Sequence, residues 1–262
     1  MELRVDGKRV RAGTGGRDFD PALTAAVFLH GAGMDHTVWA LQTRSFAHHE
    51  RSVLALDLPG HGGSEGPALS SIEAMADWVL KALETAGARQ ARIAGHSLGS
   101  LVALEAAARG GAVVDGLALL GFVPEMPVHT DLLSAARAGA HAALDLMVSW
   151  SFGAQAQLGS NLAPGLWLQG EAMRLLERSP ALSLAADLGA CALYKGAAAA
   201  GAAIRCPTVF VLGAEDHMTP ARNGRAFAER IPGARVEVLA GIGHMMMIED
   251  PKGTLAALKT VL

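Results

Sequence analysis

The stretch Ala91-Arg92-Ile93-Ala94-Gly95-His96-Ser97-Leu98-Gly99 leads from an apolar segment into an Ala- and Leu-rich helical pattern that continues to Arg109. Its centre has the form Gly-x-Ser-x-Gly. The form alone is not specific, because 31 of the 262 residues are glycine. The context makes it specific, since a serine on a sharp turn from strand to helix exposes its hydroxyl, and glycine two positions away on either side leaves room for the turn. We therefore predict that Ser97 is a nucleophile.

Short apolar runs recur along the chain, with helical patterns between them. The runs that suit buried strands are 25–30, 53–58, 91–94, 117–122, 208–212 and 236–239. The helical patterns are 37–48, 70–85, 97–109, 220–230 and 245–262. This alternation predicts an α/β domain in which a mostly parallel sheet carries helices on both faces. In such a sheet the active site lies at the carboxyl ends of the strands.

Two segments depart from the alternation. Residues 3–10 predict a hairpin that turns at Asp6-Gly7. Residues 125–203 contain no convincing strand and are rich in Ala, Leu, Gly and Met. A segment of this length is too long for a simple connection and should fold into helices with their own packing. We therefore predict a core formed by residues 1–124 and 204–262, and a helical cap or lid formed by residues 125–203.

A serine hydroxyl needs a general base, and the base needs an acid that holds its tautomer. Among the ten histidines, His244 follows the last apolar run, in Gly241-Ile242-Gly243-His244. Asp216 follows the run 208–212 and is our choice for the acid, with its neighbour Glu215 as the rival and Glu125 as a more distant candidate. The predicted triad is therefore Ser97, Asp216 and His244.

A second glycine-rich loop, His30-Gly31-Ala32-Gly33, follows the apolar run 25–30. Backbone N–H groups in such a loop can donate hydrogen bonds to the oxyanion that develops when a carbonyl is attacked. We assign one donor to the N–H of Ala32, with that of Gly33 as the alternative. The second donor is the N–H of Leu98, the residue after the nucleophile.

The charge balance and composition exclude several classes of function. Lys plus Arg is 22 and Asp plus Glu is 25, and a net charge of −3 gives no electrostatic reason to expect nucleic acid or an anionic membrane as partner. Charged residues at the N-terminus interrupt the apolar stretch that a signal peptide would need, and no apolar run reaches the length of a membrane span. We therefore expect a cytoplasmic protein that acts on a small molecule. The two cysteines fit no closed zinc pattern and no His-Glu-x-x-His motif occurs, so we expect neither metal nor cofactor.

Taken together, these motifs resemble those of the α/β-hydrolase fold family. The matching segments, in family order, are 30–33, 57–64, 95–99, 213–216 and 241–244. We interpret the segment 57–64, Asp-Leu-Pro-Gly-His-Gly-Gly-Ser, as structural. The resemblance implies a mostly parallel sheet of about eight strands and a helical cap over the pocket, in the region assigned to residues 125–203.

The expected activity is that of a serine esterase that acts through an acyl-enzyme on a small or medium-sized apolar acyl group. The same triad could instead serve C–C bond hydrolysis, thioester cleavage, perhydrolysis or lyase chemistry. An epoxide hydrolase or dehalogenase of the family would need Asp in place of Ser97. A non-catalytic relative that only binds a ligand is the alternative from a different class.

Candidates for the pocket wall come from the glycine-rich loops, the predicted cap and the segment after the base. For each of them, ordinary core packing is the alternative. The main set is His30, Gly31, Gly33, His96, Met147, Trp150, Trp167 and Met245. Further apolar candidates are Phe152, Leu166, Met173, Met246 and Met247.

Overall fold

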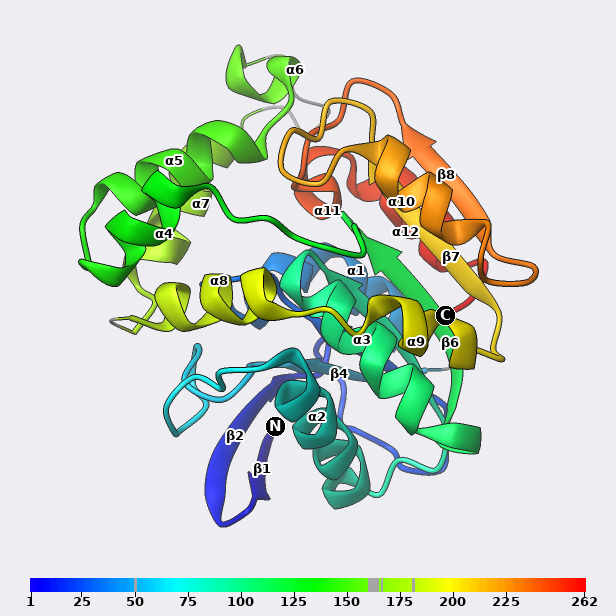
Figure 1. Ribbon diagram of the computed structural model, residues 1–262. Coiled ribbons are helices and arrows are strands. Elements are labelled where there is room, and N and C mark those ends of the chain that lie inside the picture. Colours follow the sequence, from blue (N-terminus) through cyan, green and yellow to red (C-terminus); the bar gives the residue numbers. More distant parts are fainter. Residues whose placement is uncertain (50, 160–164, 166, 181) are drawn as a thin grey trace.

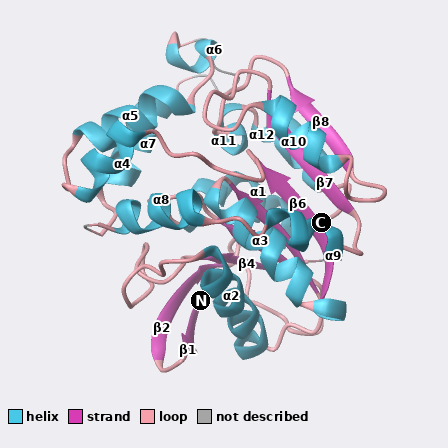
Figure 2. Cartoon of the chain, in the orientation of Figure 1, coloured by secondary structure: helices cyan, strands magenta, loops and turns pink. Residues whose placement is uncertain are grey.

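The sheet is built from the short apolar runs of the sequence. The computed structural model describes residues 1–49, 51–159, 165, 167–180 and 182–262, and within them eight strands form a single sheet (Figures 1 and 2). The strands are β1 (Glu2–Val5), β2 (Lys8–Gly13), β3 (Ala25–Leu29), β4 (Ser52–Leu56), β5 (Ala91–His96), β6 (Val114–Leu120), β7 (Thr208–Gly213) and β8 (Arg235–Leu239). Their order across the sheet is β1-β2-β4-β3-β5-β6-β7-β8.

Strands β3 to β8 are parallel, whereas β1 and β2 form an antiparallel hairpin that joins β4. At the turn of the hairpin, Asp6 and Gly7 have positive φ angles of 49° and 78°, as a type I′ turn requires. All residues of β3, β4 and β7 are buried because helices cover both faces of the sheet. The predicted fold class and the hairpin are confirmed, and the predicted strands are present with ends that differ by a few residues.

Helices α2, α3, α9 and α10 cover one face of the sheet, and α1, α11 and α12 cover the other (Figure 1). The helices of the sheet domain are η1 (His36–Trp39), α1 (Ala40–Ala47), α2 (Ile72–Ala86), α3 (Leu98–Arg109), η2 (Gly111–Val113), α10 (Ala221–Ala228), α11 (Met246–Glu249) and α12 (Pro251–Leu258). None of the described helices combines the length and the apolar character that a bilayer crossing needs.

Local residues explain where several helices begin. The Ser71 side chain caps α2, and Pro251 is the first residue of α12, a position where its missing N–H costs nothing. Pro220 begins the predicted helical pattern 220–230 but lies just before α10, because its ψ of 128° is extended rather than helical. The predicted helix 37–48 is divided into the 3-10 turn η1 and helix α1.

The described residues between β6 and β7 form six helices and no strand. They are α4 (Thr130–Arg137), α5 (Ala142–Ser151), α6 (Ala154–Gln157), α7 (Leu168–Glu177), α8 (Ser183–Leu193) and α9 (Ala197–Ala203). Helix α5 packs on both α4 and α7, whereas α9 packs on α3 (Figure 1). Tyr194, after α8, donates a hydrogen bond to Glu105 of α3 at 2.7 Å. The end of the segment is thus attached to the sheet domain, and the division at residues 125 and 203 stays a prediction.

Candidate active site

Ser97 occupies the sharp turn between β5 and α3. Its φ of 53° and ψ of −121° are strained for a residue with a side chain. A Cβ atom at Gly99 would lie 2.5 Å from the carbonyl oxygen of His30, so glycine is required where α3 begins beside the end of β3. The N–H of Ser97 donates to the carbonyl oxygen of Leu120 at 2.9 Å, which holds the turn against the end of β6. The turn thus presents Ser97 at the carboxyl edge of the sheet.

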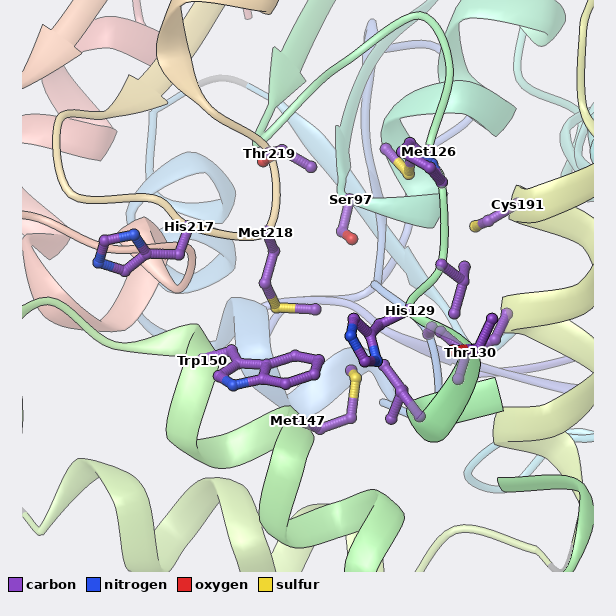
Figure 3. Close-up of a pocket in the computed structure, with 15 residues that line it drawn as sticks. Ser97, Met126, His129, Thr130, Met147, Trp150, Cys191, His217, Met218 and Thr219 are labelled. Carbon is purple, nitrogen blue, oxygen red and sulfur yellow. The ribbon is translucent and has the colours of Figure 1, made fainter. Parts of the chain in front are cut away.

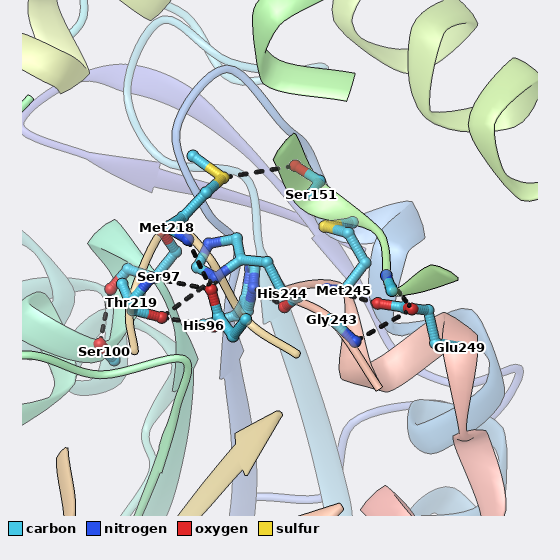
Figure 4. A network of polar contacts seen from close by, with 12 residues as sticks. His96, Ser97, Ser100, Ser151, Met218, Thr219, Gly243, His244, Met245 and Glu249 are labelled. Atoms are coloured by element: carbon cyan, nitrogen blue, oxygen red, sulfur yellow. Dashed lines mark hydrogen bonds and ion pairs between the residues drawn. The ribbon is translucent and has the colours of Figure 1, made fainter. Parts of the chain in front are cut away.

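Asp216 and His244 face each other from two loops at the same edge of the sheet. Asp216 follows β7 and His244 follows β8, and Nδ1 of the ring donates to Oδ2 of the carboxylate at 2.8 Å. Thr219 supports the carboxylate, because its Oγ1 donates to Oδ2 at 2.5 Å and its N–H donates to Oδ1 at 2.7 Å. Figure 4 shows Thr219 and His244 within this network. All three side chains are buried, so the pair is shielded from water.

The surroundings of Asp216 keep its carboxyl group ionised. Burial is the largest influence on the pKa of Asp216 and would raise it. The charge of His244 and the hydrogen bonds from His244 and Thr219 together outweigh burial and hold this pKa below its ordinary value. The ionised carboxylate fixes Nδ1 of His244 as a donor, which leaves Nε2 as the nitrogen that can take up a proton.

The two other acidic candidates are directed elsewhere. Oε2 of Glu215 accepts a hydrogen bond from the N–H of Ala154 at 2.8 Å. Glu125 forms an exposed ion pair with Lys195 at 2.7 Å. Of the three predicted acids, all of which the structure describes, Asp216 is the one whose carboxylate contacts His244.

The ring of His244 lies beside the turn that carries Ser97. The centroids of the His96 and His244 rings are 4.6 Å apart, and Nε2 of His96 donates to the carbonyl oxygen of His244 at 2.8 Å (Figure 4). Gly121 follows Leu120, whose carbonyl oxygen accepts the hydrogen bond from the N–H of Ser97. A Cβ atom at Gly121 would lie 3.0 Å from Cε1 of His244. Within the described residues, Oγ of Ser97 and His244 form no hydrogen bond. Such contacts are often long without substrate and tighten when it binds.

A buried carboxylate holds the loop that carries His244. Glu249 of α11 accepts hydrogen bonds from the N–H groups of Gly243 at 3.1 Å and Met245 at 3.0 Å, the two neighbours of His244 (Figure 4). It also accepts from the N–H of Gly153 at 2.9 Å. Burial raises the pKa of Glu249, although these N–H groups favour the ionised form. The position of His244 is therefore tied to α11.

The predicted oxyanion donors lie in the two loops next to the nucleophile. Ala32 follows β3 and lines the same cavity as Ser97, and Leu98 is the first residue of α3. In the part of the chain that the structure describes, neither of these N–H groups has a hydrogen-bond acceptor. The N–H of Gly33, the alternative donor, is bonded to Oδ2 of Asp187 at 2.8 Å. The N–H groups of Ala32 and Leu98 are thus free to bind a ligand oxygen.

Ser97 opens into a cavity of about 630 Å³ (Figure 3). The wall comes from the loops after β3, β6 and β7 and from helices α4, α5 and α8. It is lined by Ala32, Ser97, Met126, Pro127, Val128, His129, Thr130, Leu132, Met147, Trp150, Leu188, Cys191, His217, Met218 and Thr219. Among these described residues there is no Asp, Glu, Lys or Arg, so the wall suits an uncharged and largely apolar group.

Two of the eight main candidates for the wall, Met147 and Trp150, line this cavity. Trp167 does not line this cavity, because its side chain is 76% exposed and lies against Gly170 of the helix that follows it. The other five are buried behind the site and form no part of the wall: His30, Gly31, Gly33, His96 and Met245.

The further apolar candidates do not line the cavity either. Phe152, Met246 and Met247 are buried in the core, and Met173 is half-buried against it. These four side chains serve core packing, which was the alternative given for each candidate. Leu166 lies outside the described residues.

Most residues of the wall were not predicted from the sequence. The loop after β6 contributes residues 126–129, and the loop after β7 contributes His217, Met218 and Thr219. Both loops follow the carboxyl ends of strands near the one that precedes Ser97. This position, where ligands bind in parallel sheets, is the signal that could have identified them.

Asp35, His36 and Asp57 place possible metal-ligating atoms within 4.8 Å of one another. The Asp57 carboxylate accepts from the N–H and Nδ1 of His36 at 2.7 and 2.8 Å, and from the N–H of Gly63 at 2.8 Å. These hydrogen bonds tie the loop after β4 to η1. We therefore interpret the cluster as a structural support of the segment 57–64.

The model of the family described as "Alpha/beta hydrolase family" matches residues 26–258. The chain belongs to the alpha/beta hydrolase family. The fold of this alpha/beta hydrolase matches that of the enol-lactonase from Burkholderia xenovorans LB400 with a TM-score of 0.87, over 99% of this chain and 98% of that chain, at 22% identity. A thermophilic esterase matches with a TM-score of 0.78 at 27% identity, over 99% and 95% of the two chains.

Relatives of this alpha/beta hydrolase are named as hydrolases. The putative carbamate hydrolase RutD of Klebsiella pneumoniae (strain 342) is 30% identical over 244 residues, which cover 88% of each chain. The (E)-2-((N-methylformamido)methylene)succinate hydrolase of Acinetobacter baylyi is 36% identical over 77 residues, only 29% of each chain. The family and these relatives identify the alpha/beta hydrolase as a hydrolytic enzyme.

Proposed function

We propose that this alpha/beta hydrolase is a serine esterase for small or medium-sized apolar acyl groups. The observation that carries the proposal is the 2.8 Å hydrogen bond between Nδ1 of His244 and Oδ2 of Asp216, in a buried site beside Ser97. A histidine oriented by an ionised carboxylate next to a serine on a strained turn is the arrangement that nucleophilic catalysis by serine needs.

Acyl transfer proceeds in two steps. Oγ of Ser97 attacks the ester carbonyl carbon while Nε2 of His244 takes the hydroxyl proton. The C–O bond to the alcohol then breaks, and the imidazolium returns this proton to the leaving oxygen. In the second step His244 takes a proton from water, the water oxygen attacks the acyl carbon, and the proton passes to Ser97 as the acid leaves. Asp216 stays ionised and stabilises the imidazolium throughout.

The negative charge that develops on the carbonyl oxygen is bound by the N–H groups of Ala32 and Leu98. Both groups lack an acceptor within the described chain and both belong to segments fixed by packing. A donor that is already oriented needs no rearrangement during the reaction, and each such donor lowers the barrier by about 3 kcal/mol. The N-terminus of α3 adds a favourable partial charge at the same place.

The cavity supports an apolar acyl group. Met126, Met147 and Met218 line it, and their flexible thioether side chains adapt to ligands of different shape. Trp150 adds a large apolar surface. A cavity of about 630 Å³ lies in the range that binds small organic molecules. On this proposal residues 125–203 act as the cap over the site, above a core of residues 1–124 and 204–262.

A fluorophosphonate probe tests the nucleophile without assuming a substrate. We expect one adduct, located on Ser97 by mass spectrometry and absent from Ser97→Ala. The matched control is Ser149→Ala, which removes an exposed hydroxyl that bonds within its own helix and should leave labelling unchanged. Full turnover of an activated ester by Ser97→Ala would refute the proposed function.

A carbamate is the second candidate substrate, favoured by the 30% identity to a putative carbamate hydrolase over 88% of this chain. Attack on its carbonyl would use the same residues, as would thioester, C–C or perhydrolysis reactions. Comparing kcat/KM for 4-nitrophenyl esters of increasing acyl length with kcat/KM for a 4-nitrophenyl carbamate, a thioester and a C–C diketone decides between them. Esters with apolar acyl groups should be fastest.

A further inference from the structure

Asp187 of α8 is a fully buried carboxylate that contacts the predicted oxyanion loop. Its Oδ2 accepts hydrogen bonds from the N–H of Gly33 at 2.8 Å and from Nε2 of His61 at 2.9 Å. The side chain is 0% exposed. The two contacts span 154 and 126 positions of the sequence, so they join α8 to two separate loops of the sheet domain. Neither the proposed triad nor any sequence motif uses Asp187.

His61 neutralises the charge of Asp187. Nε2 of the ring faces Asp187, and Nδ1 lies 3.1 Å from the carbonyl oxygen of Pro59. Because both nitrogens face acceptors, these contacts favour the doubly protonated, positive form of the ring. Burial acts most strongly on the pKa of His61 and would lower it, but the contacts with Asp187 outweigh burial and raise this pKa. In this protonated form His61 and Asp187 make a buried ion pair, which adds no net charge beside the oxyanion site.

The contact with Gly33 fixes the peptide next to the Ala32 donor. Gly33 has a φ of +69°, and a Cβ atom there would lie 3.2 Å from the side chains of Leu176 and Leu184. The tip of the loop is therefore held by packing on one side and by the carboxylate on the other. With the N–H of Gly33 taken by Asp187, the N–H of Ala32 is left free at the cavity.

We propose that Asp187 is a positioning residue for the oxyanion hole, which holds the loop 30–33 so that the N–H of Ala32 faces the substrate carbonyl. This proposal rests on the serine hydrolase function proposed above. A second contact supports the role of α8, because Oγ of Ser183 donates to the carbonyl oxygen of Gly60 at 2.8 Å. Helix α8 thus belongs to the catalytic framework, while it also contributes Leu188 to the cavity wall.

Two substitutions of similar size separate hydrogen bonding from packing. Asp187→Asn keeps an oxygen that accepts from Gly33, and its NH₂ group can donate to Nε2 of a neutral His61 that has its proton on Nδ1. Asp187→Leu fills the space but has no acceptor. The matched control is Asp145→Asn in α5, whose exposed carboxylate contacts only His141 among the described residues. To calculate kcat, the concentration of active sites is taken as the concentration of protein that the fluorophosphonate labels at completion.

For each labelled site we expect Asp187→Leu to lower kcat by about 10- to 100-fold with KM within about twofold. The variant displaces the Ala32 donor without removing it, so it should lose only part of the roughly 100-fold or more that one oxyanion donor contributes. Asp187→Asn should keep kcat within about threefold of the parent enzyme. In hydrogen exchange followed by mass spectrometry, peptides that cover residues 30–33 should stay protected in the Asn variant and exchange faster in the Leu variant.

Several results would overturn the proposal: equal losses in both variants, an unchanged kcat per labelled site in Asp187→Leu, or a rise confined to KM. Failure of the proposed function has a different signature, since the parent enzyme would then lack the Ser97 adduct. In that case hydrogen exchange alone decides, and equal protection of residues 30–33 in both variants would show that Asp187 does not hold the loop.

Discussion

A Cβ atom at Gly95 would lie 2.0 Å from the carbonyl oxygen of Gly99, because the chain passes from β5 into α3 within a few residues. The two backbones approach so closely that no side chain fits between them. Ser97 lies at the centre of this turn, and its positive φ is held by the same crowding. The geometry of the proposed nucleophile thus depends on two glycines, Gly95 and Gly99, that do not line the cavity.

Gly95→Ala should therefore damage both stability and activity. The new methyl group forces the start of α3 to move, which we expect to cost about 2 kcal/mol or more in the free energy of unfolding and to lower kcat at least 100-fold. Urea denaturation and ester kinetics measure the two effects. The control is Gly189→Ala in α8, where the new Cβ atom would meet nothing within 4 Å apart from its chain neighbours and the backbone of its own helix. It should be neutral or stabilising by up to about 1 kcal/mol. Parent-like behaviour of Gly95→Ala would contradict the argument.

Asp216→Asn tests whether Asp216, and not its neighbour Glu215, is the acid that orients His244. An amide cannot stabilise the imidazolium and favours the wrong tautomer of His244, so we expect kcat to fall by about 10³- to 10⁴-fold with little change in KM. Glu215→Gln is the control, since this side chain accepts from a backbone N–H instead of contacting His244. Its kcat should change less than tenfold. The reverse order of the two losses would reassign the acid.

Glu249→Gln tests the support of the histidine loop. The substitution replaces one oxygen of Glu249 by an NH₂ group, which cannot accept the hydrogen bond from the backbone N–H that faces it. We therefore expect a loss of about 2 kcal/mol in the free energy of unfolding together with a lower kcat. The comparison is Glu229→Gln, an exposed glutamate at the end of α10, which should stay within about 0.5 kcal/mol of the parent. Equal stability of the two variants would show that the three N–H contacts contribute nothing.

Stability should fall as the pH is lowered from 6.5. Burial, followed by a neighbouring histidine, lowers the pKa of His30 to about 4 and the pKa of His96 to about 3. Both groups titrate near 6.5 in the unfolded chain. Below pH 6.5 the unfolded chain therefore binds protons that the folded chain does not, which favours unfolding. The raised pKa of His61 acts above pH 6.5, where it makes stability fall as the pH rises.

His96→Gln isolates one of these groups. Gln can still donate to the carbonyl oxygen of His244, but it does not titrate. Between pH 7 and pH 5 the variant should lose about 2 kcal/mol less of its free energy of unfolding than the parent, as measured by urea denaturation at each pH. An unchanged pH slope would mean that the folded protein accommodates a protonated His96.

Trp150→Ala should change the preference for acyl length. Removal of this ring from the cavity wall should lower kcat/KM about tenfold for medium-sized acyl groups and less for acetyl, because the larger groups lose more apolar contact. Trp167→Ala is the matched control, since that side chain is 76% exposed. A uniform loss across the ester series would indicate damage to the site rather than to the wall.

The central turn, the strands and the loops that carry Asp216 and His244 could be predicted from the sequence because each depends on neighbouring residues. A buried parallel strand needs a short apolar run, and the turn at Ser97 needs glycine at two fixed positions. The carboxyl ends of parallel strands meet at one edge, so residues that follow different strands approach one another. Local pattern therefore determined the fold class and the neighbourhood of the site.

Only the tertiary structure decided which side chains face one another there. Asp216 and Glu215 are neighbours in the chain, and packing of the loop after β7 directs one toward His244 and the other toward Ala154. Packing likewise brought Trp150 of α5 to the cavity and left Trp167, which precedes α7, exposed. The contact of Asp187 with His61 spans 126 positions, and no local pattern encodes it. Side-chain direction depends on packing between segments that are distant in the chain, which composition and periodicity do not record.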